Sequence, residues 1–105
     1  MNTGQTQADI YAAIQGVEHP AIASSLVDLG MIRDVDIVSE ENTVSLTLVL
    51  PVINIPQNVL NYMVNSLYQA IKDAGSELTK VQIAQMTEDE RQKFYLMEQQ
   101  NWRGS

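Results

Sequence analysis

The sequence contains a single histidine, His19, which is the side chain best suited to acid–base chemistry or to metal binding. Imidazole titrates near neutral pH, so His19 could act as a general base together with Asp28 or another nearby carboxylate. The alternative is structural, because His19 stands directly before Pro20 and is pushed toward extended geometry at the end of a helix. We favour the structural role, since the chain has no cysteine and no second histidine that could share a metal ion.

Two aspartates, Asp34 and Asp36, are spaced i, i+2 and therefore share one face of an expected strand. Paired carboxylates can share a proton or hold a hard cation. On the outer face of an amphipathic strand, such residues are more often simply solvated. The sequence therefore predicts neither a catalytic residue nor a metal site.

The segment Pro51–Pro56 (PVINIP) is unusual, because loops are normally polar and this one is apolar and stiffened by two prolines. One interpretation is that it packs into the core as the lead-in to a helix. The other is that it forms an exposed apolar patch for recognition. The expected binding surface consists of His19, Asp28, Pro51, Val52, Ile53, Asn54, Ile55 and Pro56.

Apolar residues at helical spacing predict the helices that position these side chains. They indicate a helix from Gln7 that Gly16 and Pro20 end, a short helix over 21–29, and a long helix from Gln57 that stops at Gly75. Thr87 and Glu90 form a capping box, which predicts a last helix carrying Phe94 and Met97 inward and Trp102 near its inner side.

Alternating apolar residues predict three strands over 33–39, 43–50 and 78–86, of which the first two form a hairpin. Val35, Ile37, Val44, Leu46, Leu48, Leu50, Val81 and Ile83 are expected to point inward. The second and third strands should be parallel, because a helix connects them. The order α-(α)-β-β-α-β-α predicts an α+β fold in which a small mixed three-stranded sheet packs with helices.

Length and composition limit the functions that the chain can have. Its 105 residues suit a single domain, 1–105, with a core over about 7–97, and its formal net charge of −7 disfavours binding to nucleic acids or anionic membranes. The absence of cysteine excludes disulfides, thiol catalysis and cysteine-ligated clusters within the chain. The sequence shows no signal peptide, no apolar run of membrane-spanning length and no common catalytic motif, so we expect a cytoplasmic protein.

His19-Pro20 followed by SLVDLGMIRDV (25–35) resembles the SufT/PaaD-type, or MIP-eighteen-like, domain family that is linked to iron–sulfur cluster assembly. The same domain type is fused to the N-terminus of Mrp-type P-loop ATPases. The family pattern is a helix, a D-P-E motif, a segment like SLVDLGMI, a hairpin, a T-x-P-x-C-P-like loop, a helix, a strand and often a short final helix. The resemblance covers about residues 7–97.

Two departures from the family pattern affect what the resemblance implies. His19-Pro20-Ala21 stands in place of D-P-E, and Pro51–Pro56 stands in place of the loop with the family's cysteine. The chain is thus similar to a cysteine-free branch, as in some Mrp N-terminal domains. The resemblance then implies a non-catalytic adaptor that meets an Mrp-type ATPase or another assembly factor through its loop face. The resemblance also implies that the chain binds no cofactor itself and contacts a cluster only through that partner.

Two alternatives to the adaptor remain open. One is a small enzyme that uses His19 with nearby carboxylates. The other is an interaction module unrelated to clusters, held as a homodimer or a similar small homo-oligomer through the last helix.

Overall fold

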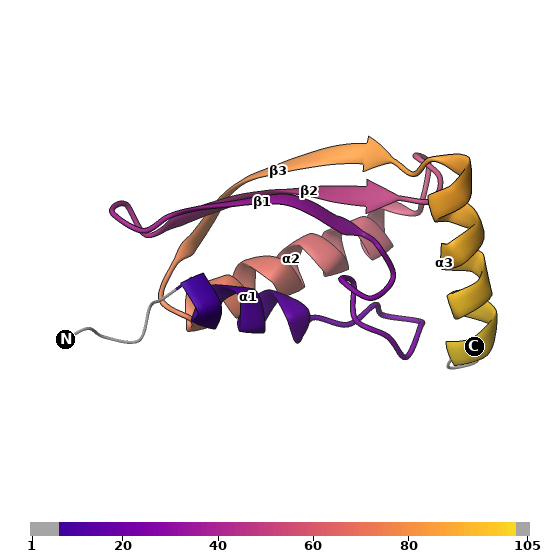
Figure 1. The fold of residues 1–105 in the computed structure, drawn as a ribbon, viewed down its shortest axis with the longest axis horizontal. Coiled ribbons are helices and arrows are strands. Elements are labelled where there is room, and N and C mark those ends of the chain that lie inside the picture. Colours follow the sequence, from indigo (N-terminus) through magenta and orange to yellow (C-terminus); the bar gives the residue numbers. More distant parts are fainter. Residues whose placement is uncertain (1–6, 103–105) are drawn as a thin grey trace.

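The computed structural model describes residues 7–102, which form an α+β fold of three helices and three strands (Figure 1). The elements are α1 (Gln7–Gln15), β1 (Ile32–Val38), β2 (Thr43–Leu50), α2 (Gln57–Asp73), β3 (Glu77–Gln85) and α3 (Glu88–Asn101). The predicted fold class is confirmed, and the predicted bounds of β2 agree with the structure at both ends.

The three strands form one mixed sheet in the order β1-β2-β3. β1 runs antiparallel to β2, whereas β3 runs parallel to β2, as expected for strands joined through a helix. α1 and α2 cover one face of the sheet, and α3 stands across its end (Figure 1). The opposite face of the sheet carries no helix along most of its length (Figure 1).

The hydrophobic core lies between the sheet and the helices α1 and α2. Ile10 and Ile14 of α1 and Met63, Leu67 and Ile71 of α2 are almost fully buried. In β2, Val44, Leu46, Leu48 and Leu50 are buried as predicted. Thr47 and Val49 are buried as well, although alternation alone placed them on the wet face. This burial arises because β2 is the central strand. Arg33 of β1 and Gln82 of β3, for example, pair with Thr47 from its two sides.

A β-bulge in β1 changes which of its residues face the core. Asp34 has a φ of 57°, and the register with β2 shifts between Arg33 and Asp36. The extra residue allows Ile32 to pack against the core together with Val35 and Ile37. The inward positions predicted for Val35 and Ile37 are confirmed, but period-two alternation could not predict the bulge.

β3 is an edge strand, and this explains why one of its inward-facing residues is not buried. Val81 packs against the core, but Ile83 is 42% exposed although it pairs with the buried Leu48. An edge strand has a neighbour on one side only, so an inward-facing residue at its end can stay in contact with solvent.

Residues 21–25 are bends and isolated bridges, and residues 26–30 form hydrogen-bonded turns, instead of the short helix predicted over 21–29. The Leu29 N–H donates to the Ser25 carbonyl, and the Gly30 N–H donates to the Val27 carbonyl. Ile22 pairs with Trp102 and Ser25 pairs with Glu18 in isolated β-bridges, and these hold residues 22 and 25 in extended geometry. The apolar spacing that indicated a helix instead reflects burial, because Ile22, Leu26 and Leu29 are all in the core.

The ends of α2 and α3 are set by local sequence signals. Gly75 adopts a φ of 97°, and the N–H groups of Gly75 and Ser76 donate to the carbonyls of Lys72 and Ile71, which closes α2 with a Schellman motif. The capping box predicted at the start of α3 is present in both directions between Thr87 and Glu90. No helix between residues 7 and 102 is long and apolar enough to cross a bilayer.

Candidate functional site: a loop end held by the last helix

The loops that contain most of the predicted binding surface meet at one end of the molecule. Residues 16–31 lead into β1 and residues 51–56 leave β2, and these two strands are antiparallel, so the two segments reach the same end of the sheet (Figure 1). β3 ends there too and leads into α3. We call this region, formed by residues 16–31, residues 51–56 and α3, the loop end.

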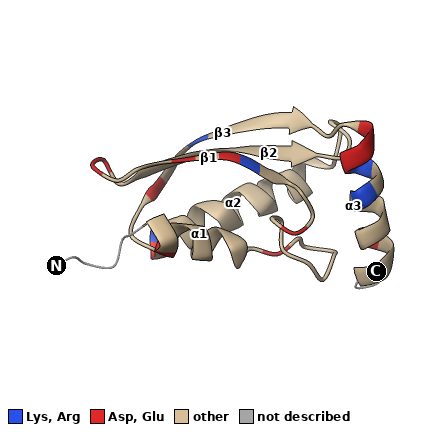
Figure 2. Ribbon diagram, viewed as in Figure 1, with Lys and Arg blue, Asp and Glu red and all other residues tan. Residues whose placement is uncertain are grey.

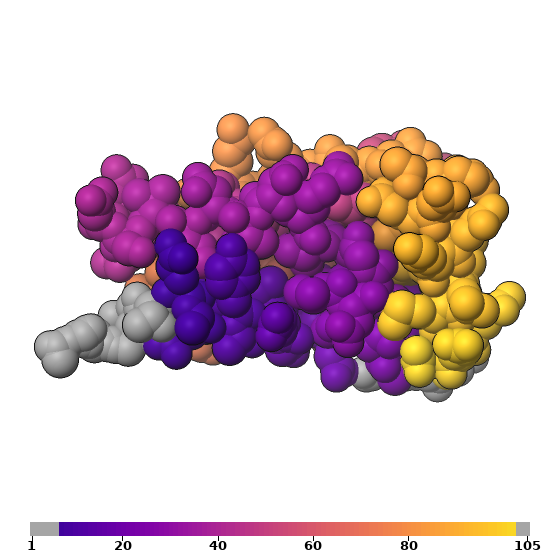
Figure 3. Space-filling view, in the orientation of Figure 1, coloured from indigo at the N-terminus to yellow at the C-terminus, as the bar shows by residue number. Residues whose placement is uncertain are grey.

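α3 is the element that joins the two loops. Arg91 Nη1 donates to the Pro51 carbonyl at 3.5 Å. The Phe94 ring lies edge-on to His19, with 6.4 Å between the ring centroids, and Phe94 is buried. At the far end of the helix, the Ala23 N–H donates to the Asn101 carbonyl at 2.8 Å. The surfaces of 16–31 and α3 are continuous in the space-filling view (Figure 3).

His19 is half-buried and shapes the turn that contains it. The backbone N–H of His19 donates to the Ser24 carbonyl at 3.1 Å, and the ring Nδ1 of His19 accepts from the backbone N–H of Ala21 at 3.0 Å. Nδ1 therefore carries a lone pair in this arrangement. Together with the edge contact to Phe94, these bonds make His19 a support for both the turn and α3.

His19 and Asp28 face different hollows of the surface. His19 lines a groove of about 500 Å³ between its own loop and α2, together with Glu18, Tyr62, Ser66 and Gln69. Asp28 is exposed and lines a separate hollow of about 290 Å³ with Glu90, Lys93 and Met97. The structure therefore does not bring His19 and Asp28 into one cavity, as a general base and its partner require.

The segment Pro51–Pro56 is divided between core and surface. Pro51 is buried, Val52 is half-buried, and Ile55 packs against the core. Ile53 is 58% exposed, and Asn54 and Pro56 are exposed beside it. Each of the two interpretations thus describes part of the loop: Pro51 and Ile55 anchor it on both sides of the tip, and the tip presents the Ile53 side chain to solvent.

Charged groups at the start of α3 are paired with one another. Arg91 Nη2 lies 2.6 Å from Glu88 Oε1, and the hydrogen bond from Arg91 holds the pKa of Glu88 below its ordinary value. The pKa of Glu90 is lowered chiefly by the hydrogen bond from the Thr87 N–H, and Arg33 Nη1 lies 3.9 Å from Glu90 Oε2. Acidic and basic residues accordingly adjoin in the first turns of α3 (Figure 2).

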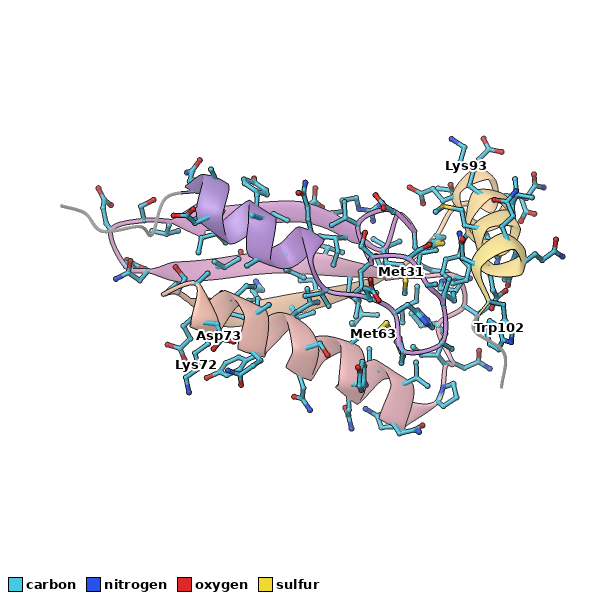
Figure 4. The ribbon with its side chains drawn as sticks, turned by 90° about the horizontal axis from the view of Figure 1, so that it is seen from below. Met31, Met63, Lys72, Asp73, Lys93 and Trp102 are labelled. Carbon is cyan, nitrogen blue, oxygen red and sulfur yellow. The ribbon has the colours of Figure 1, made fainter. Side chains whose placement is uncertain are left out.

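The described residues contain no group of three or more His, Cys, Asp or Glu side chains arranged to hold a metal ion. Asp34 lies within the β1 bulge and Asp36 follows it, so the two aspartates do not alternate as in a regular strand. Two large sulfur-containing side chains, Met31 and Met63, point into the interior near the loop end (Figure 4), where both are buried.

Sequence reasoning did not predict the bridging role of α3. The capping box indicates where the helix begins, but not the contact of Arg91 with Pro51 or the backbone pairing near Trp102. Phe94 is a core residue as predicted, whereas Tyr95 and Trp102 are 41% and 48% exposed.

The fold and its loop end define a class: a small α+β domain in which a three-stranded mixed sheet presents two loops at one end. The model of the iron-sulfur cluster assembly protein family matches residues 7–84, and the chain belongs to this family. Membership indicates a role in iron–sulfur cluster assembly. No curated protein matches the chain significantly.

A crystal structure of a domain of unknown function, DUF59, from Bacillus anthracis is similar to this chain, with a TM-score of 0.61. The sequences are 19% identical, and the comparison covers 81% of each chain. At this identity the likeness supports the fold alone.

Proposed function

We propose that this protein is a non-catalytic adaptor in iron–sulfur cluster assembly or transfer, and that it contacts an Mrp-type P-loop ATPase carrier through its loop end. In this role the cluster is cargo held by the partner, because the chain has no cysteine of its own. The contact surface comprises the exposed tip of 51–56, the turn around His19 and the neighbouring Asp28.

One observation carries the proposal. The two segments that stand in place of the family's D-P-E and cysteine motifs, 19–21 and 51–56, lie at the same end of the molecule (Figure 1). α3 holds both of them in place through Arg91 and Phe94. The chain has no thiol at this end, which favours recognition of a protein over direct chemistry on a cluster.

The exposed groups of the loop end suit a protein contact. Ile53 offers an apolar side chain at the tip of a loop that is stiffened by prolines, so little conformational entropy is lost when it binds. Asn54 beside it is polar and exposed, as expected at the rim of an interface.

The experiment is deletion of the gene in its native cell, followed by assays of several iron–sulfur enzymes. The proposal predicts reduced activities that the wild-type chain and the Asn54→Asp variant restore and the Ile53→Asp variant does not. Rescue by His19→Asn, which keeps an acceptor for the Ala21 N–H but has no imidazole, separates the adaptor from an enzyme based on His19. Unchanged iron–sulfur enzyme activities after the deletion would contradict the proposal.

A further inference from the structure

The free edge of the sheet along β3 has the properties of a pairing surface. β3 contacts β2 on one side only, and Thr79, Lys80, Gln82, Ile83 and Gln85 are all exposed. From Lys80 to Gln85 its register with β2 is regular, so its outward backbone groups form an even row. A regular edge with an exposed apolar residue readily accepts another strand.

The other edge of the sheet is different. β1 is interrupted by the bulge at Asp34 and carries a second acid, Asp36. Bulges and charges are the features that protect edges from pairing. Within 78–86, by contrast, Lys80 is the one charged residue, and the C-terminal part of β3 is uncharged (Figure 2).

We infer that β3 pairs antiparallel with β3 of a second copy of this chain, with Gln82 opposite Gln82 of that copy. With a two-fold axis perpendicular to the sheet, two residues that are directly opposite each other have their side chains on the same side of the sheet. In this register Val81 lies opposite Ile83 and Lys80 lies opposite Ala84. Apolar residues meet in pairs and no two like charges are directly opposed, although each chain carries a net charge of −7.

The flank of α2 supports the same arrangement. Residues on one flank of α2, among them Tyr62, Ser66 and Gln69, line the groove next to residues 16–19. Leu60, Val64 and Tyr68 are spaced i, i+4, i+8 and form a stripe on the other flank, toward β3.

Leu60 and Val64 are only partly buried, and Tyr68 is 38% exposed. The two-fold axis places both α2 helices on one face of the joined sheet, so these stripes face each other. Lys72 and Asp73 lie at the far end of α2 (Figure 4), away from the axis near Gln82.

A cysteine cross-link tests the register, because the chain has no cysteine of its own. Residues that are directly opposite in an antiparallel pair have Cα atoms about 4.5–5.5 Å apart, within the range of a disulfide. Gln82→Cys should therefore form a covalent dimer under mild oxidation. Lys80→Cys lies on the same face of the same strand, but its two copies stand about 13 Å apart in this register and should not cross-link.

Light scattering of the native chain and of two charge variants tests whether the β3 edge forms the dimer contact. We expect a species of twice the 11.7 kDa chain mass that dissociates on dilution. Ile83→Lys should give a monomer with an unchanged circular dichroism spectrum. Leu96→Lys adds the same charge to α3, where Leu96 is 57% exposed, and should remain dimeric.

Three results would overturn the inference. The first is a strict monomer at every concentration. The second is equal cross-linking of Gln82→Cys and Lys80→Cys. The third is loss of the dimer in Leu96→Lys with retention in Ile83→Lys, which would place the contact on α3. The inference does not depend on the proposed function, because the loop end takes no part in it.

Discussion

At the scale of single residues, Ile53 and Ile55 have the same side chain two positions apart but lie in opposite environments. Ile55 packs against the core, whereas Ile53 is 58% exposed. The sequence predicts that Pro51–Pro56 is unusual, since its composition departs from that of ordinary loops. It does not predict which isoleucine is buried, because neither the helical nor the strand period applies between two prolines.

The two residues should respond differently to the same substitution. Ile55→Asp should destabilise the fold by about 2–4 kcal/mol, since it places a carboxylate against apolar neighbours. Ile53→Asp should leave the melting temperature nearly unchanged. Thermal unfolding followed by circular dichroism measures both, with Asn54→Asp as the control for an added charge. Equal destabilisation by the two isoleucine variants would contradict the division of the loop into anchor and tip.

At the scale of elements, local sequence signals predicted helix ends better than they predicted irregular backbone. Thr87 with Glu90 and the stop at Gly75 depend on a few adjacent residues, so they can be predicted from the sequence alone. The bends and turns over 21–30 and the bulge at Asp34 depend on partners far along the chain, such as Trp102 for Ile22. Sequence periodicity indicates which residues are buried in both cases, but it does not identify the backbone conformation that buries them.

The capping box makes the stability of α3 depend on pH. The Thr87 N–H donates to Glu90 Oε1 at 2.9 Å and lowers the pKa of Glu90 from 4.5. A carboxyl with a lowered pKa stabilises the folded state above its ordinary pKa, and this contribution is lost as the pH falls through the lowered value. The wild type should therefore be more stable than Glu90→Gln at neutral pH, and the difference should disappear at acid pH.

Denaturant unfolding at a series of pH values measures this difference, and Asp89→Asn is the control for removing one negative charge from the same turn. A difference between wild type and Glu90→Gln that stays constant with pH would show that the carboxylate charge contributes nothing to the cap.

At the scale of the whole molecule, the fold brings three separate segments to one end. The sequence predicts the elements and their order, and antiparallel pairing of β1 with β2 then places 16–31 and 51–56 together. The role of α3 is less accessible to sequence reasoning. It lies beyond residues 7–84, which the family model matches, and its contacts with both loops are tertiary.

Phe94 should contribute much of the energy that holds α3 against the loop end. Its side chain is 4% exposed and contacts His19, so Phe94→Ala should cost about 3–5 kcal/mol of unfolding free energy. Tyr95→Ala, next to it and 41% exposed, should cost far less. Denaturant unfolding compares the two, with Phe94→Leu as a milder variant that keeps the fold. Similar costs for Phe94→Ala and Tyr95→Ala would mean that α3 is not anchored through Phe94.

The most direct test of the adaptor role is anaerobic affinity purification of the chain from its native cell, with mass spectrometry of the retained proteins. We expect the wild type and Asn54→Asp to retain an Mrp-type ATPase or a cluster scaffold, and Ile53→Asp to lose it while remaining folded. Retention of neither protein by the folded wild type, or equal retention by Ile53→Asp, would contradict recognition of a cluster carrier through the loop end.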